Sequence, residues 1–442
     1  MSYLRVLSLV LVVSTTTAAD TIPSDRNAVI HALNRLTFGP APGDVDRVQR
    51  QGLATWIDQQ LNPSRISDAG LNGKLAVTPA RPPSNDPKEM RRAAREDVLN
   101  LAGERLTREI YSDRQLEEVL VDFWFNHFNV YAGKGRTATF LRDYEREAIR
   151  PYVFGKFRDL LGATAHHPAM LFYLDNWMSV DPSSQLPTPR AQNPTAKAKN
   201  KRRGLNEKYG RELLELHTLG VDGGYTQKDV TEVARAFTGW TIDGRGRPGS
   251  PGGGFRFVPR MHDAGKKVVL GQTIPAGGGI KDGERVLDIV ASHPSTAHHI
   301  AYELAQRFVS DEPPQALVDR AAARFTATGG DLREVVRTIV TSPEFFAPET
   351  RNAKIKTPLE FVVSAVRATG DARVNIPFNP AAMAKGLKDL GMPLYMCQPP
   401  TGYDDTADAW VGAGAFVTRI NLASRLAGAD ATLVSSPEFQ RR

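Results

Sequence analysis

The chain has 442 residues, with 56 lysines and arginines against 49 aspartates and glutamates, and a net charge of +7. This length can bury a large core in one large domain or two ordinary ones, and the apolar (41%) and charged (24%) fractions argue against wholesale disorder. The single cysteine, Cys397, excludes an internal disulfide. We interpret it as a buried, inert side chain, with a reactive or covalently modified thiol as the alternative.

The first residues predict a secretory signal. Arg5 precedes an apolar run from Val6 to Val13, and small residues follow up to Ala19, where we expect cleavage. A membrane anchor is disfavoured because the run is far shorter than the roughly 20 residues that span a bilayer. We therefore expect residues 1–19 to be a signal peptide and the mature chain to be exported (periplasmic or secreted), without a transmembrane helix.

Helical periodicity dominates the chain that follows. The apolar spacing predicts helices over 25–36 and 43–61, the second bent near Gly52, and a long helical region over 88–130 with an interruption near Ser112. Three proline-, glycine- or polar-rich stretches are predicted to be loops: 78–87, 183–203 and 244–254. Residues 183–203 form a flexible, basic insertion in this interpretation. Export argues against nucleic acid as its partner.

Within the long helical region, one histidine falls on the apolar side. At 100° per residue, His127 shares a face with leucine, valine and aromatic side chains of 115–131. Asp122 and Asn126 form an adjoining ridge, four residues apart. We therefore expect His127 to point into the protein beside two polar groups.

The stretch 206–240 predicts two helices joined by a glycine turn. On the first helix His217 lies towards the apolar side, whereas Glu207 and Arg211 lie four residues apart on the other side. Thr226 is a good N-cap for the second helix, with an aspartate three residues later. A polar centre built around this hairpin is the main functional expectation.

The remaining chain predicts a small β-hairpin and further helices. Residues 255–258 and 267–270 are expected to pair with each other around 261–264. Helical segments are expected over 144–165, from about 282, and over 296–308, 314–327, 332–341, 358–369, 381–390 and 407–426. Because no repeat or composition shift divides the chain, we predict a mainly α, large single-domain multi-helix bundle over 20–430, with a small β-hairpin and long loops, and a C-terminal tail over 431–442.

Two histidines on apolar faces are the principal candidates for chemistry. A buried imidazole needs partners, because an unsatisfied buried polar group costs on the order of 1–3 kcal/mol. If their helices face each other, His127 and His217 can meet, and histidine with a carboxylate can act as a general base. The candidate catalytic residues are His127, His217, Glu207 and Arg211.

The same histidines also suit a divalent metal ion, which would activate water or oxygen. The candidate ligands are His127, His217, Glu212 and Asp122. The pattern contains no HExxH and no paired ExxH, and Glu215 lies about 200° from His217 on an ideal helix. A hydrogen-bonded structural network is the alternative to a metal site.

Polar and aromatic residues close to these motifs are candidates for binding a substrate. They are Asn126, Asn206, Asp175, Asn176, Trp177, Gln398 and Tyr403. Stacking of aromatic rings on a carbohydrate would suit an exported protein, with the filling of a large helical core as the alternative. A serine hydrolase is disfavoured, since the sequence has neither a G-x-S-x-G elbow nor a βαβ pattern.

Several long motifs resemble a known bacterial family, the domain of unknown function 1800 family. They include HALNRLTFGPAPGDVDRV, VDFWFNHFNVYAGKG, GLNEKYGRELLELHTLGVDGGYTQKDVTEVARAFTGW and LYMCQPPTGYDDTADAW. The resemblance extends from about Asn27 to Leu426 and implies an exported bacterial protein, often encoded beside a second exported family of unknown function. It carries no agreed catalytic residues.

Two functions from different classes follow. The first is an exported enzyme that depends on a metal or on histidine and carboxylate groups and acts on an extracytoplasmic substrate. The alternative is a non-catalytic binding or assembly partner of another exported envelope protein, in which the same polar groups serve structure.

Overall fold

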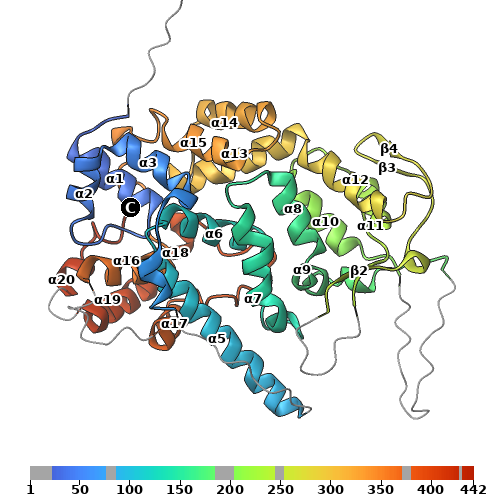
Figure 1. Ribbon diagram of the computed structural model, residues 1–442, viewed down its shortest axis with the longest axis horizontal. Coiled ribbons are helices and arrows are strands. Elements are labelled where there is room, and N and C mark those ends of the chain that lie inside the picture. Colours follow the sequence, from blue (N-terminus) through green and yellow to red (C-terminus); the bar gives the residue numbers. More distant parts are fainter. Residues whose placement is uncertain (1–21, 76–85, 185–203, 244–252, 371–379, 428–430) are drawn as a thin grey trace, which may run out of the picture.

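The computed structural model describes residues 22–75, 86–184, 204–243, 253–370, 380–427 and 431–442 (Figure 1). Helices make up most of this part of the chain, and its strands form two short antiparallel pairs. The fold is therefore mainly α, as predicted. The signal segment and most of the three predicted loops lie outside the described residues. Within the described part, no helix combines the length and apolar character that crossing a bilayer requires.

The N-terminal helices are α1 (Arg26–Leu36), α2 (Asp44–Gln51) and α3 (Leu53–Gln60). Asp25 caps α1, because its carboxylate accepts from the main-chain N–H groups of Asn27 and Ala28. The helix predicted over 43–61 is two helices, since Gly52 between them has a φ of +89°. The short helix α4 (Ala69–Asn72) follows.

The long helical region is α5 (Pro87–Tyr111) and α6 (Gln115–His127), separated near Ser112 as predicted. Figure 1 shows α5 extending from the body of the molecule with its N-terminal half outermost. Its C-terminal half buries Leu101, Leu106 and Ile110. Helix α6 is buried along most of its length, so the expected apolar face is part of the core.

Shorter helices lead from α6 to the hairpin region. They are α7 (Leu141–Asp143), a π-helical turn (Tyr144–Ile149), α8 (Phe157–His166) and α9 (Pro168–Tyr173). Short 3₁₀ turns lie at Pro63–Arg65, Thr137–Phe140, Arg150–Tyr152, Asn176–Met178, Pro259–Met261 and Pro348–Thr350.

The predicted helical hairpin is α10 (Glu207–Glu215) and α11 (Gln227–Ala236). Thr226 caps α11, as predicted, and Asp229 completes a reciprocal capping box with it. The two helices approach closely at Gly210, where a Cβ atom would lie 2.9 Å from the carbonyl oxygen of Val230. Glycine at this position therefore lets the hairpin close.

The β structure differs from the prediction. Strand β2 (Phe255–Phe257) pairs with β1 (Trp240–Ile242), and β3 (Lys267–Val269) pairs with β4 (Gln272–Ile274). Both predicted segments are strands, but the expected pairing between them is wrong. The reason is local: Gly271, with a φ of +76°, allows a tight reversal directly after β3.

The remaining helices follow the predicted order: α12 (Ile280–Ala291), α13 (Pro294–Phe308), α14 (Gln315–Ala327), α15 (Leu332–Val340), α16 (Pro358–Thr369), α17 (Pro380–Asp389), α18 (Ala407–Trp410), α19 (Ala413–Ala427) and α20 (Ala431–Val434). The helix expected over 407–426 is interrupted at Val411, whose backbone is extended. The segment predicted as a tail packs against the body, because Val434 is buried and Arg441 forms a β-bridge with Ile355.

Candidate functional site

His127 lies in the last turn of α6, inside the protein. Its side chain is only 3% exposed, and its ring packs edge-on against Trp124 and Phe128, with centroid separations of 5.3 and 4.5 Å. The predicted apolar face therefore carries the imidazole inward. There it meets residues of two helices far away in the sequence.

Both ring nitrogens of His127 face oxygen acceptors. Nδ1 lies 2.7 Å from Oε2 of Glu303 on α13, and Nε2 lies 3.2 Å from the main-chain oxygen of His217, just after α10. The ring is therefore held from two sides, by the Glu303 carboxylate and by a main-chain carbonyl. We call the unit of His127, His217 and Glu303 the histidine clamp, because it joins α6 and α13 to the turn that follows α10.

The electrostatics of Glu303 agree with this pairing. Burial acts to raise the pKa of its carboxyl group, but the charge and hydrogen bond of His127, together with nearby His299, hold that pKa below its ordinary value. The Glu303 side chain is 29% exposed, so the clamp is buried at its histidine end and reaches solvent at its carboxylate end.

His217 contributes its main chain to the clamp, and its ring lies beside that of His127. The two ring centroids are 6.2 Å apart, so the predicted meeting of the histidines is present. Burial and the neighbouring His127 lower the pKa of His217 to about 3. Its Nε2 atom is buried and has no hydrogen-bond partner among the described residues. Burial therefore keeps the His217 ring neutral beside the bonded pair of His127 and Glu303.

Sequence reasoning missed the two residues that α13 contributes, Glu303 and His299. The His299 ring lies 6.3 Å from that of His127, and its Nε2 atom is 3.6 Å from Oε1 of Glu303. The chain passes close to this ring at Gly220, where a Cβ atom would lie 3.2 Å from Nδ1 of His299. The spacing of four residues between His299 and Glu303 was the available sequence signal, because it places both side chains on one helix face.

The predicted metal ligands are not assembled. The carboxylate of Asp122 bonds the guanidinium of Arg105 and lies 3.6 Å from Nη2 of Arg307. Glu212 is half-buried, and burial raises its pKa while Lys208 opposes that change. Among the described residues, no group of three or more histidine, cysteine, aspartate or glutamate side chains could hold a metal ion. The two histidines meet, but Asp122 neutralises arginine instead of joining them.

The other predicted catalytic residues bond the second helix of the hairpin. The carboxylate of Glu207 accepts from Gln227 (2.9 Å) and Thr231 (3.0 Å), and Arg211 donates to Gln227 at 2.5 Å. These contacts tie α10 to α11 on the outer side of the hairpin. The structure gives neither side chain a bond to the histidine clamp.

Two predicted substrate-binding residues, Asn126 and Tyr403, bond each other. The Asn126 amide donates to the main-chain oxygen of Tyr403 at 2.8 Å and accepts from its N–H at 2.7 Å. Gly402 makes this contact possible, since a Cβ atom there would lie 2.5 Å from Asn126. The main-chain oxygen of Gln398 accepts from the hydroxyl of Tyr173 at 2.7 Å. These bonds fix the segment from Gln398 to Tyr403 across the end of α6.

The last group of predicted residues connects the segment after α9 to its neighbours. Asn206 caps α10 and donates to the main-chain oxygen of Leu174. The Asn176 amide is buried and lies 3.2 Å from the carbonyl oxygens of Phe237 and Trp240. Asp175 pairs with Lys134 at 2.6 Å, and the Trp177 ring stacks on Phe172 with centroids 5.6 Å apart.

The sequence that supplies these contacts also determines the protein family to which the chain belongs. A family model described as "protein of unknown function (DUF1800)" matches residues 31–441. The chain belongs to this DUF1800 family. No curated protein and no solved structure matches it significantly, so the family description supplies membership without a reaction.

In this DUF1800 protein, Cys397 is buried as expected. Burial, with Asp404 nearby, raises the pKa of its thiol to about 11. The thiol therefore stays protonated near neutral pH, and the inert interpretation fits this environment better than a reactive thiolate.

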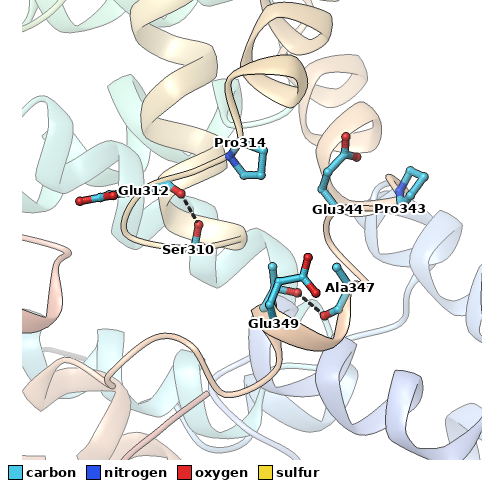
Figure 2. A pocket seen from close by; sticks show the side chains of 8 residues that line it. Ser310, Glu312, Pro314, Pro343, Glu344, Ala347 and Glu349 are labelled. Carbon is cyan, nitrogen blue, oxygen red and sulfur yellow. Dashed lines mark hydrogen bonds between the residues drawn. The ribbon is translucent and has the colours of Figure 1, made fainter.

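A cleft of about 390 Å³ opens between the start of α14 and the segment after α15 (Figure 2). It is lined by Ser310, Glu312, Pro314, Pro343, Glu344, Ala347, Glu349 and Thr350. Figure 2 shows Glu312 and Glu344 on opposite sides of the opening. The Glu344 carboxylate pairs with Arg320 at 2.7 Å. None of the residues predicted from the sequence for catalysis, substrate or metal lines this cleft.

Proposed function

We propose that this protein is an exported, non-catalytic binding protein that assembles with a second exported protein, and that its histidine clamp serves the fold. The observation that carries the proposal is the double bonding of His127, to Glu303 on one side and to the His217 carbonyl on the other. The signal-like start of the sequence supports export.

The geometry of His127 is unfavourable for acid–base catalysis. A general base needs a nitrogen lone pair within reach of the substrate proton, but both nitrogens of His127 are engaged and its side chain is almost fully buried. Glu207 and Arg211 are likewise engaged with α11. These polar groups act as cross-links between helices, and a substrate would have to break those links to use them.

Exposed apolar side chains support a partner. Eight large apolar side chains of the described part are exposed, and four of them lie between residues 396 and 417: Met396, Val411, Phe416 and Val417. Burying apolar surface at an interface lowers the free energy by roughly 25 cal/mol for each Å² removed from water. Three of these eight side chains, Val411, Phe416 and Val417, lie within seven residues around the start of α19, so this is the region where we place the contact with the second exported protein.

A second candidate function rests on His217. Its neutral ring carries a buried Nε2 atom without a partner, beside the bonded His127–Glu303 pair. Two histidines whose environments separate their charge states are a feature of acid–base sites. An enzyme of this kind would lose its activity when His217 is replaced, whereas folding would be unaffected or improved.

The family resemblance implies a second exported protein encoded nearby, and co-purification with that protein tests the proposal. We expect a stable complex in size-exclusion chromatography, and we expect Val417→Glu to abolish it. Val221→Glu is the matched control, because Val221 (67% exposed, against 57% for Val417) lies in the turn after α10. Failure to form a complex, or equal loss with both variants, would contradict the proposed contact.

A further inference from the structure

Exposed acids accompany the exposed apolar side chains at the start of α19. Asp404 and Asp408 are exposed, and they precede Val411, Phe416 and Val417, which are 64%, 43% and 57% exposed. Residues 403–418 contain three aspartates and no lysine or arginine, whereas the whole chain has a net charge of +7. We call Asp404, Asp408, Trp410, Val411, Phe416 and Val417 the acidic apolar patch.

Hydrogen bonds hold the first members of this patch together in space. The indole N–H of the half-buried Trp410 donates to the main-chain oxygen of Asp404 at 2.8 Å. The N–H of Val411 bonds the carbonyl of Ala407 at 3.0 Å, so Asp408 lies in the turn that ends at Val411. Helix α19 begins two residues later. The acids are therefore neighbours of the apolar side chains in the fold as well as in the sequence.

The two exposed acids differ from the acids beneath them. Asp405 lies 3.3 Å from two buried arginines, and Asp311 pairs with Lys354 at 2.6 Å. Asp404 and Asp408 form no ion pair with the lysines and arginines that the structure describes. Carboxylates of aspartate are ionised at neutral pH, so two negative charges on this surface are left without a counterpart in that part of the chain.

The patch is also fixed to the body of the molecule. Asp311 accepts from the main-chain N–H of Ala407 at 2.8 Å, and Lys354 donates to the main-chain oxygen of Asp405 at 2.6 Å. A surface that is already ordered loses less conformational entropy when a partner binds. The patch is therefore a preformed contact surface with an acidic border.

The charge of this surface decides between kinds of partner. A symmetric contact between two copies would bring the acids of both into one interface, and an anionic lipid surface would repel them. We propose that the second exported protein contacts the acidic apolar patch with a segment that carries lysine or arginine beside apolar side chains. Its basic groups lie against Asp404 and Asp408, and its apolar groups cover Val411, Phe416 and Val417. This inference rests on the proposed function and specifies the chemistry of the partner's contact.

Neutralising the two acids without changing their shape tests the inference. The dissociation constant of the complex is measured by calorimetry for the natural chain and for the double variant Asp404→Asn, Asp408→Asn, at about 50 and 300 mM sodium chloride. We expect the natural complex to weaken with salt. The double variant should bind roughly fivefold more weakly at the lower concentration and respond less to salt. Asp222→Asn is the matched control, because Asp222 is exposed in the turn after α10, and it should bind like the natural chain.

The outcomes separate this inference from the proposed function. A complex that Val417→Glu abolishes, but whose affinity and salt response are the same in the natural chain and the double variant, would overturn the basic partner segment and leave the contact itself standing. The absence of a complex at either salt concentration would contradict the proposed function and this inference with it. Self-association of the natural chain in analytical ultracentrifugation, abolished by Val417→Glu, would also overturn the inference, because a second copy would then cover the patch.

Discussion

The histidine clamp and a group of side chains that we call the arginine cluster both bury charge between helices that are distant in the sequence, but they balance it differently. In the clamp, one imidazole meets one carboxylate, and Glu303 keeps contact with solvent. The arginine cluster consists of Arg307, Arg442, Glu360, Asp405 and Asp122. In it, Glu360 and Asp405 each contact both arginines, and Asp122 lies 3.6 Å from Arg307. The comparison teaches that a single pair leaves its carboxylate partly in solvent, whereas shared carboxylates let two arginines be buried almost completely.

The largest effect is expected in the arginine cluster. Glu360→Gln keeps the shape of the side chain but removes a carboxylate shared by Arg307 and Arg442. Breaking a buried ion pair on one side costs about 3–5 kcal/mol of unfolding free energy, measurable by urea denaturation. Asp46→Asn is the control, because the Arg26–Asp46 pair is exposed and its loss should leave stability nearly unchanged. Equal behaviour of the two variants would show that this cluster does not stabilise the fold.

The same carboxylate predicts acid sensitivity. Burial acts to raise the pKa of Glu360, but Arg307 and Arg442 lower it from 4.5 to about 2. A lowered carboxyl pKa means that the stabilisation is present above pH 4.5 and is lost as pH falls towards 2. The natural chain should therefore lose stability over this range, and Glu360→Gln should lose less of it.

A smaller effect is expected in the histidine clamp. His127→Gln removes the hydrogen-bond partner of the Glu303 carboxylate, and a hydrogen bond to a charged group contributes about 1.5–3 kcal/mol. His298→Gln is a matched control on α13, since His298 is exposed and its ring contacts Gln315 at 3.0 Å. Denaturant unfolding should separate the two variants. If His127→Gln is as stable as the control, the clamp is not a structural unit.

A histidine that gains an ion pair on folding has a raised pKa, whereas burial lowers the pKa of His217. The stability of the fold should therefore change with pH in the opposite direction. The folded-state pKa of His217, about 3, lies below the ordinary value of 6.5, so the unfolded chain binds a proton first as pH falls. Stability is fully present above pH 6.5 and decreases towards pH 3. Between pH 6.5 and 5, His217→Asn should remove up to roughly 2 kcal/mol of this loss. An unchanged pH slope would show that His217 is protonated in the folded protein.

The smallest effect is local and lies outside both regions. Thr226→Ala removes the side chain that caps α11 in its capping box with Asp229. Loss of such a cap costs about 1 kcal/mol, which thermal unfolding can detect. Thr226→Ala should leave the clamp and the arginine cluster unchanged. Glu360→Gln and His127→Gln should therefore each lower the unfolding free energy by the same amount with or without it.

Local patterns predicted much of the fold. The order and approximate bounds of the helices follow from apolar periodicity, and the cap at Thr226 follows from side-chain chemistry. The pairing of β2 with β1 did not, because the sequence around β2 gives no measure of which earlier segment will lie beside it. The break at Gly52 was anticipated only as a bend, since a glycine can occupy a helix or end one.

Part of the candidate site also followed from local patterns, and the rest depends on contacts between residues far apart in the sequence. The inward direction of His127 follows from helix geometry, and its predicted meeting with His217, which lies just after α10, is observed. Their partner Glu303 was missed, because a glutamate on α13 looks like an ordinary solvent-facing charge. The complete burial of Arg35 in the last turn of α1 was missed likewise. Its burial depends on contacts with Thr350, more than 300 residues later, which no local pattern encodes.

A double-mutant cycle of His127→Gln and Glu303→Gln, followed by denaturant unfolding, tests the structural role of the clamp most directly. The account predicts that both single variants are less stable than the natural chain and that their coupling energy is at least about 1 kcal/mol. Single variants that are as stable as the natural chain, or more stable, with additive effects in the double variant would contradict it and favour a catalytic role.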